Sequence, residues 1–160
     1  ASMTCAMDIR LASEKAKIGF VFNKIGITPE ACSSWFLPRI VGPSTALEWC
    51  YTADVLDAET LREARYVKTV HAPEQLLEAA YAIARKIVVH SPVSIALTRQ
   101  MMYRNAAEDH PVKAHEVDSL AIFYASLNSG KEGVNSFLEK RAPAFTEKAS
   151  SDMPPFYPWW

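Results

Sequence analysis

Glu30 is the residue whose type and setting most directly suggest chemistry. It is a lone carboxylate in an otherwise apolar stretch, residues 27–40, and it directly follows Thr28 and Pro29. A threonine hydroxyl can cap a helix and proline suits the first helical position, so we expect a helix to begin here with Glu30 in its first turn.

Two interpretations of this carboxylate are open. Burial among Ile27, Trp35 and Phe36 would raise its proton affinity while the free amides of the helix end would lower it, leaving a base able to take and return a proton. Alternatively, Glu30 is an ordinary first-turn acid that stabilises the helix dipole.

Other residue types that could carry chemistry lack the required spacing. The histidines are scattered without metal-ligand spacing, and this predicts no metal site. Ser33 and Ser34 lack the flanking glycines of a nucleophile turn, and five glycines form no phosphate-binding loop. The four histidines are His71, His90, His110 and His115.

Composition narrows the class of protein. With 160 residues, 49% hydrophobic and 22% charged, the chain can bury a core, and a net charge of −1 gives no field that would attract nucleic acid. No apolar run approaches the roughly 20 residues that span a membrane. Three cysteines favour a reducing compartment, so we expect a cytoplasmic location, or an organelle matrix.

The first half of the chain alternates short strands and helices. Residues 9–13, 16–21 and 66–70 are predicted strands, residues 44–51 form a predicted short helix, and Asp57 is expected to cap another helix. This mixture predicts an α/β class, with residues 1–72 forming one region.

From Pro73 onward the pattern is helical. Apolar residues recur at three- and four-residue spacings from residue 76 to 88, and further helices are expected over 92–103, from Pro111 to a stop at Gly130, and before Pro143. Residues 73–141 thus form a predicted helical region. The remaining residues, 142–160, are a proline- and aromatic-rich tail that is either frayed or docked into a groove of this chain or of a neighbouring subunit.

The run from residue 7 to 20, continued through Gly26 to Val41 and Gly42, resembles the second half of a crotonase, the enoyl-CoA hydratase/isomerase superfamily. The resemblance implies a partial spiral of ββα units followed by C-terminal helices that pack subunits into a homotrimer or a dimer of trimers. It implies an acyl-CoA substrate whose coenzyme A is part of the substrate, with no separate cofactor. Residues 1–7 read as the last turns of a helix, so we expect a C-terminal fragment.

Around Glu30 the sequence is most similar to peroxisomal-type Δ3,Δ2-enoyl-CoA isomerases, in which the glutamate at this position moves the proton. The two glutamates with which crotonase-type hydratases position water fall here at about Ser2 and Phe22, and neither can act as a base. The amides that hold the enolate oxygen in the family would lie upstream of Ala1. The leading hypothesis is therefore double-bond isomerisation, the alternatives being hydration of a 2-enoyl-CoA and a non-catalytic oligomerisation fragment.

Two further positions take their interpretation from the same resemblance. Phe137 and Lys140 match the family's last helix, which approaches the coenzyme A of a neighbouring subunit; the alternative is an exposed helix with solvated side chains. The chain also departs from the family, because it has Arg65 and Tyr66 where Gly-Leu is frequent, and this added bulk is expected to alter local packing.

Overall fold

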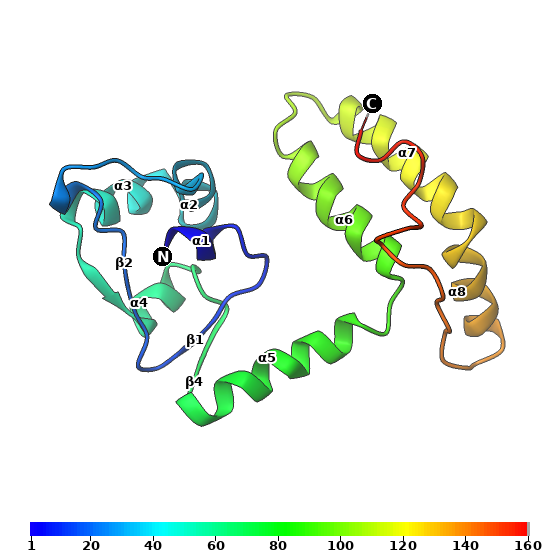
Figure 1. The fold of residues 1–160 in the computed structure, drawn as a ribbon, viewed down its shortest axis with the longest axis horizontal. Helices are drawn as coiled ribbons and strands as arrows, with labels where there is room; N and C mark the ends of the chain where they lie inside the picture. Colours follow the sequence, from blue (N-terminus) through cyan, green and yellow to red (C-terminus); the bar gives the residue numbers. More distant parts are fainter. Residues whose placement is uncertain (160) are drawn as a thin grey trace. The chain divides into compact units, whose positions relative to one another are not determined.

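The computed structural model describes residues 1–159, which form two compact units (Figure 1). The first unit comprises Ala1–Ala82 and the second begins at Ile83. The boundary falls within helix α5, Pro73–Ile87, whose start at Pro73 and amphipathic pattern agree with the sequence prediction.

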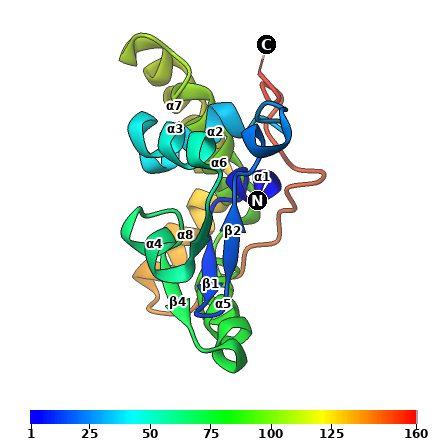
Figure 2. The ribbon, with the colours of Figure 1, turned by 90° about the vertical axis from the view of Figure 1, so that its left-hand side faces the viewer.

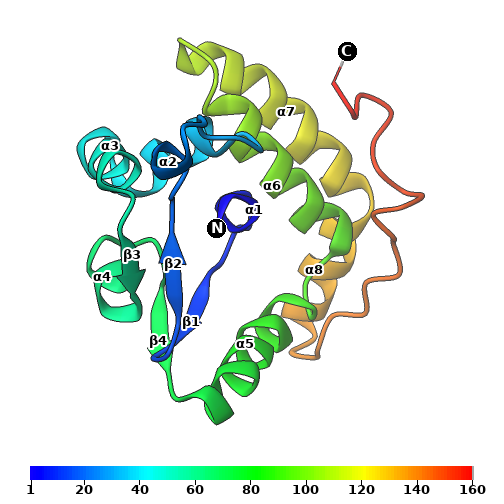
Figure 3. The ribbon, with the colours of Figure 1, turned by 60° about the vertical axis from the view of Figure 1, so that its left-hand side comes forward.

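The first unit contains four short strands and several short helices. Its strands form two pairs: β1 lies parallel to β4, with Leu11 opposite Thr69, and β2 lies antiparallel to β3, with Lys17 opposite Asp57. In Figures 2 and 3 the strands lie below helices α2 and α3. The elements are α1 (Ser2–Cys5), β1 (Leu11–Ser13), β2 (Lys17–Gly19), the 3₁₀ turn η1 (Asn23–Ile25), α2 (Ser33–Val41), α3 (Pro43–Thr52), β3 (Val55–Asp57), α4 (Ala58–Glu63) and β4 (Thr69–His71).

Most of these elements match the sequence prediction in type. The predicted strand regions overlap β1, β2 and β4, and the predicted helix over residues 44–51 is α3. Asp57 caps α4 as expected, since its Oδ1 accepts the amide of Thr60 at 2.9 Å. Strand β3 was not predicted, because three residues are too few to show an alternating pattern.

Three aromatic rings occupy the centre of the first unit. Phe20 stacks on Trp49 with ring centroids 6.0 Å apart, and the ring of Tyr66 meets both edge-on at 5.7 and 6.1 Å. Burial raises the pKa of Tyr66 to about 12. Its hydroxyl lies 2.7 Å from Thr4 Oγ1 and 3.4 Å from Cys5 Sγ, so the core holds α1 in place.

The second unit is helical. It contains α6 (Pro92–Asn105), α7 (Pro111–Leu127) and α8 (Ser129–Leu138), and α6 and α7 pack side by side (Figure 3).

The prediction that Gly130 ends a helix is wrong. Helix α7 ends at Leu127 and Gly130 lies in the first turn of α8, where a Cβ atom would come within 3.0 Å of the Ala125 carbonyl oxygen.

The proline- and aromatic-rich tail docks within this unit rather than fraying. Phe156 packs against buried Val93 and Leu97, and its ring lies 5.5 Å from the ring of Tyr124 on α7. The ring of Trp159 lies 6.1 Å from Phe156. The predicted role of Trp160 in this tail falls outside the described residues. The tail thus covers apolar surface of its own chain, as expected for a docked tail and not for a frayed one.

Candidate active site

Glu30 lies on a turn before α2 and not inside a helix. The expected start near Thr28 and Pro29 is wrong, because α2 begins at Ser33. Ala31 and Cys32 adopt left-handed backbone conformations, with φ of 50° and 59°. Two successive left-handed residues cannot belong to a right-handed helix, and each costs about 1–2 kcal/mol. Nothing in the residue types of Ala31 and Cys32 indicates this conformation.

Ser33 fixes the backbone of Glu30. The Glu30 carbonyl oxygen accepts the amide of Ser33 at 2.9 Å and the hydroxyl of Ser33 at 2.6 Å. The Ser33 side chain is 1% exposed, so this anchor is held within the packed unit. Glu30 therefore projects from a strained turn whose position is set by hydrogen bonds, an arrangement that clusters at functional sites.

The Glu30 carboxylate bonds to a residue distant in sequence. The Ser2 hydroxyl, on α1, donates a hydrogen bond to Glu30 Oε1. No group among residues 1–159 forms a hydrogen bond or ion pair with Glu30 Oε2. The expectation that Glu30 is buried among Ile27, Trp35 and Phe36 is wrong, because Glu30 is an exposed residue in this chain and the two aromatic rings pack against each other on α2.

A cavity of about 270 Å³ lies beside Glu30. Glu30 is its one acidic lining residue, and Ser2 and Phe22 line it as well. The structure thus brings together Glu30 and the two positions, Ser2 and Phe22, at which the family resemblance places the hydratase glutamates. The remaining lining residues are small or apolar: Ala1, Gly19, Val21, Ile25 and Ile27. The site can present one carboxylate to an apolar ligand.

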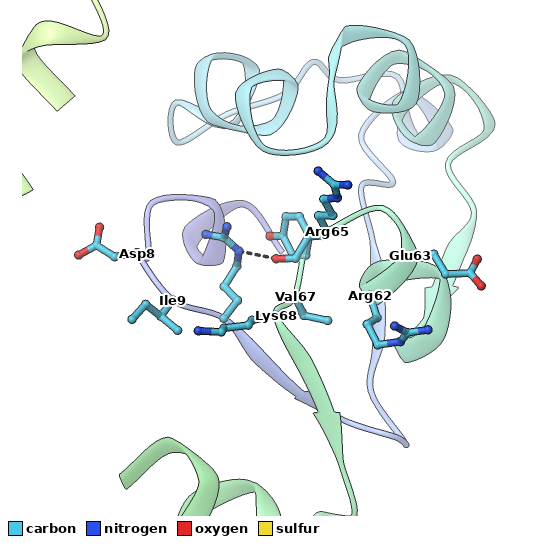
Figure 4. Close-up of a pocket in the computed structure, with 9 residues that line it drawn as sticks. Asp8, Ile9, Arg62, Glu63, Arg65, Val67 and Lys68 are labelled. Carbon is cyan, nitrogen blue, oxygen red and sulfur yellow. Dashed lines mark hydrogen bonds between the residues drawn. The ribbon is translucent and has the colours of Figure 1, made fainter. Parts of the chain in front are cut away.

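A second cavity, of about 590 Å³, lies where the chain enters β1 and β4 (Figure 4). Two of its cationic side chains are used internally: Arg10 Nε donates to the Tyr66 carbonyl oxygen at 2.6 Å, and Arg62 Nε donates to Glu59 Oε2 at 2.9 Å. Its lining residues are Asp8, Ile9, Arg10, Arg62, Glu63, Arg65, Tyr66, Val67 and Lys68.

Comparison with known proteins identifies the family. The model of the enoyl-CoA hydratase/isomerase family matches residues 1–148. The chain belongs to this family. It is 40% identical over 150 residues to an enoyl-CoA hydratase of Alternaria alternata, covering 91% of this chain and 50% of that protein. It is also 30% identical over 151 residues to the 1,2-epoxyphenylacetyl-CoA isomerase of Escherichia coli, covering 92% of this chain and 56% of that protein.

The fold agrees with this assignment. The solved structure of an enoyl-CoA hydratase from Bacillus anthracis superposes with a TM-score of 0.83 at 28% identity, covering 88% of this chain and 55% of that one. The chain therefore has the mixed α/β crotonase-like fold of the enoyl-CoA hydratase/isomerase family. It spans about half the length of the curated relatives it matches.

The two residues predicted to contact coenzyme A, Phe137 and Lys140, belong to the second unit. Phe137 is 81% exposed near the end of α8, and Lys140 is exposed just after it. Both side chains are accessible in this chain. Their role in binding coenzyme A stays a prediction.

No metal-binding cluster of three or more histidine, cysteine or acidic residues occurs within residues 1–159. Over the same residues no helix is both long and apolar enough to cross a membrane.

The three cysteines form no disulfide. Cys5 and Cys50 are buried and Cys32 is exposed. Burial raises the pKa of the Cys50 thiol.

Sequence reasoning singled out Glu30 but missed its contact with Ser2. The family resemblance placed Ser2 at the position of a hydratase glutamate, and this signal could have indicated that Ser2 lines the same cavity as Glu30. The structure adds the hydrogen bond itself and the left-handed conformations of residues 31 and 32 that follow Glu30.

Proposed function

We propose that this protein isomerises the double bond of a 3-enoyl-CoA thioester, with Glu30 as the single acid/base. Glu30 removes a proton from C2, which the thioester carbonyl acidifies. The C2–C3 double bond forms as the C3–C4 double bond shifts, and Glu30 delivers the proton to C4. The free Oε2 atom is the natural carrier of this proton, since Oε1 accepts a bond from Ser2.

The observation that carries this proposal is the make-up of the cavity. Hydration by the two-glutamate route needs two carboxylates to hold and activate one water molecule. Here Glu30 is the one acid lining the cavity, and the hydratase positions are occupied by a hydroxyl, Ser2, and an aromatic ring, Phe22.

The test is Glu30→Gln in the full-length protein, assayed with a 3-enoyl-CoA. We expect isomerisation to fall by about 10²- to 10⁴-fold, the usual contribution of a positioned base, with the unfolding midpoint unchanged. Glu14→Gln is the matched control, because Glu14 is an exposed carboxylate outside the cavity. Isomerisation at the wild-type rate in Glu30→Gln would reject the proposed function.

Hydration of a 2-enoyl-CoA is the second candidate. It is supported by the relatives, because the Alternaria alternata protein that matches at 40% identity is an enoyl-CoA hydratase. Assaying the same full-length protein with a 2-enoyl-CoA and a 3-enoyl-CoA distinguishes the two reactions. Hydration that exceeds isomerisation, and that survives Glu30→Gln, would favour this second candidate.

We also propose that the helical region forms a homotrimer or a dimer of trimers, in which Phe137 and Lys140 approach the coenzyme A of a neighbouring subunit. Large exposed apolar side chains support an interface, including Val88 at 72% and Phe137 at 81% exposure. A chain truncated after Arg141 tests whether the tail takes part. An unchanged oligomer size in sedimentation would exclude the tail from the interface.

A cytoplasmic location, or an organelle matrix, completes the proposal. It is supported by three unpaired cysteines, of which Cys32 is exposed and would oxidise readily outside a reducing compartment.

A further inference from the structure

The hydrogen bond between Ser2 and Glu30 joins two segments that are 28 residues apart in sequence. Ser2 is the first residue of α1, and Glu30 follows the loop that contains η1. Both residues line the same cavity. A contact of this kind between a hydroxyl and the proposed base can set the direction of the base.

Each partner is anchored independently of the other. On the Ser2 side, Thr4 and buried Cys5 of α1 meet the hydroxyl of Tyr66 in the aromatic core. On the Glu30 side, the Ser33 amide and hydroxyl bond to the Glu30 carbonyl oxygen. Because neither segment depends on the hydrogen bond for its place, the bond acts on the orientation of the carboxylate.

An exposed glutamate samples many rotamers, and ordering it costs side-chain entropy. A hydrogen bond to Oε1 removes much of that freedom while Oε2 keeps no protein partner among the described residues. A base that must serve both C2 and C4 of one substrate needs one fixed direction more than it needs burial.

We propose that Ser2 is a positioning residue that holds the Glu30 carboxylate in its proton-transferring orientation. The inference rests on the proposed function of Glu30. Ser2 itself moves no proton: it donates its hydroxyl hydrogen to Oε1 throughout and leaves Oε2 to exchange the proton with substrate carbon.

The test compares Ser2→Ala, Ser2→Thr and Ser34→Ala in the full-length protein with a 3-enoyl-CoA. For Ser2→Ala we expect kcat to fall about 10- to 100-fold, as for a misdirected catalytic group, with KM within about twofold of wild type. Ser2→Thr restores a hydroxyl at the same place, so its kcat should return to within about threefold of wild type. A role in folding alone would not give this split between kcat and KM.

Ser34→Ala is the matched control, because Ser34 is an exposed serine near Glu30 that does not line the Glu30 cavity. It should keep the wild-type kcat. A wild-type kcat in Ser2→Ala, or a kcat in Ser2→Thr as low as in Ser2→Ala, would overturn the positioning role. If Glu30→Gln is inactive while Ser2→Ala is fully active, the positioning role fails and the proposed function survives; activity in Glu30→Gln rejects both.

Discussion

Arg10 shows how one side chain can join two segments of the first unit. Its Nε donates to the Tyr66 carbonyl oxygen at 2.6 Å, its Nη1 donates to the Met7 carbonyl oxygen, and its guanidinium lies 5.1 Å from the centre of the Tyr66 ring. These contacts link the residues that precede β1 to those that precede β4, the two strands of the parallel pair. The first unit therefore depends on a charged side chain at a point where short strands supply few hydrogen bonds.

We predict that Arg10→Met lowers the free energy of unfolding by about 1.5–3 kcal/mol, because the Tyr66 carbonyl oxygen loses a hydrogen bond from a charged donor. Chemical denaturation of the full-length protein measures this loss. Lys68→Met is the control. Lys68 lines the second cavity as Arg10 does, but its side chain is exposed and forms no hydrogen bond or ion pair with residues 1–159, so its effect should stay within about 0.5 kcal/mol. Equal losses in the two variants would show that cavity charge matters and the Arg10 hydrogen bonds do not.

At the residue scale, the sequence indicates which atom could do chemistry but not where it points. Glu30 stands out because it is a lone acid in an apolar stretch. The sequence does not indicate its exposure, its bond to Ser2 or the left-handed conformations of Ala31 and Cys32 that follow it. Residues other than glycine seldom adopt a left-handed conformation, so alanine and cysteine at these positions give no sign of one.

At the scale of elements, the end of α4 accounts for the departure from the family at Arg65. The Arg65 amide bonds to the Arg62 carbonyl oxygen at 2.9 Å, and the Tyr66 amide bonds to the Leu61 carbonyl oxygen at 2.8 Å. This pair of hydrogen bonds is the Schellman motif, which requires a left-handed residue and favours glycine. Arg65 fills that position with φ of 60°. At Arg65 the departure therefore changes backbone strain and not packing, since this side chain is exposed, whereas the added bulk of Tyr66 lies in the aromatic core.

We predict that Arg65→Gly raises the free energy of unfolding by about 0.5–1 kcal/mol. Glycine removes a left-handed penalty of about 1–2 kcal/mol and costs about 0.5–1 kcal/mol of chain entropy. Arg65→Ala separates backbone from charge, because alanine removes the cation but keeps the strain, and it should leave stability within about 0.5 kcal/mol of wild type. A gain as large in Arg65→Ala as in Arg65→Gly would attribute the effect to charge repulsion among the cavity cations.

Helices with long periodic patterns could be predicted, whereas elements set by a few backbone angles could not. The sequence predicts α5 and α6 because proline, capping residues and apolar spacing agree over 15 and 14 residues. The start of α2 and strand β3 depend on two left-handed residues and on a three-residue pairing, respectively. Such short features carry too few residues for a periodic signal.

At the scale of the whole molecule, the C-terminal tail is held by charge as well as by apolar packing. Glu132 on α8 accepts Arg141 Nη1 at 2.6 Å and Nη2 at 2.9 Å, and its Oε1 also accepts the Ala144 amide at 2.7 Å. These bonds fix the chain where it leaves α8, ahead of the point at which Phe156 packs on α7. The sequence does not indicate the ion pair between Glu132 and Arg141, because the two residues are nine positions apart and do not have the three- or four-residue spacing of neighbours on a helix.

The same carboxylate predicts how stability depends on pH. The hydrogen bonds from Arg141, followed by that from the Ala144 amide, lower the pKa of Glu132 from 4.5 to about 2. A carboxyl whose pKa is lowered by folding stabilises the folded state above its unfolded pKa, and this contribution is lost as the pH falls from about 4.5 to about 2. We expect Glu132→Gln to unfold at a lower temperature than wild type at pH 6, and we expect the difference to shrink as the pH approaches 2. Thermal unfolding of both proteins at several values across this range provides the measurement. A difference that stays constant over the whole range would mean that folding does not lower the pKa of Glu132.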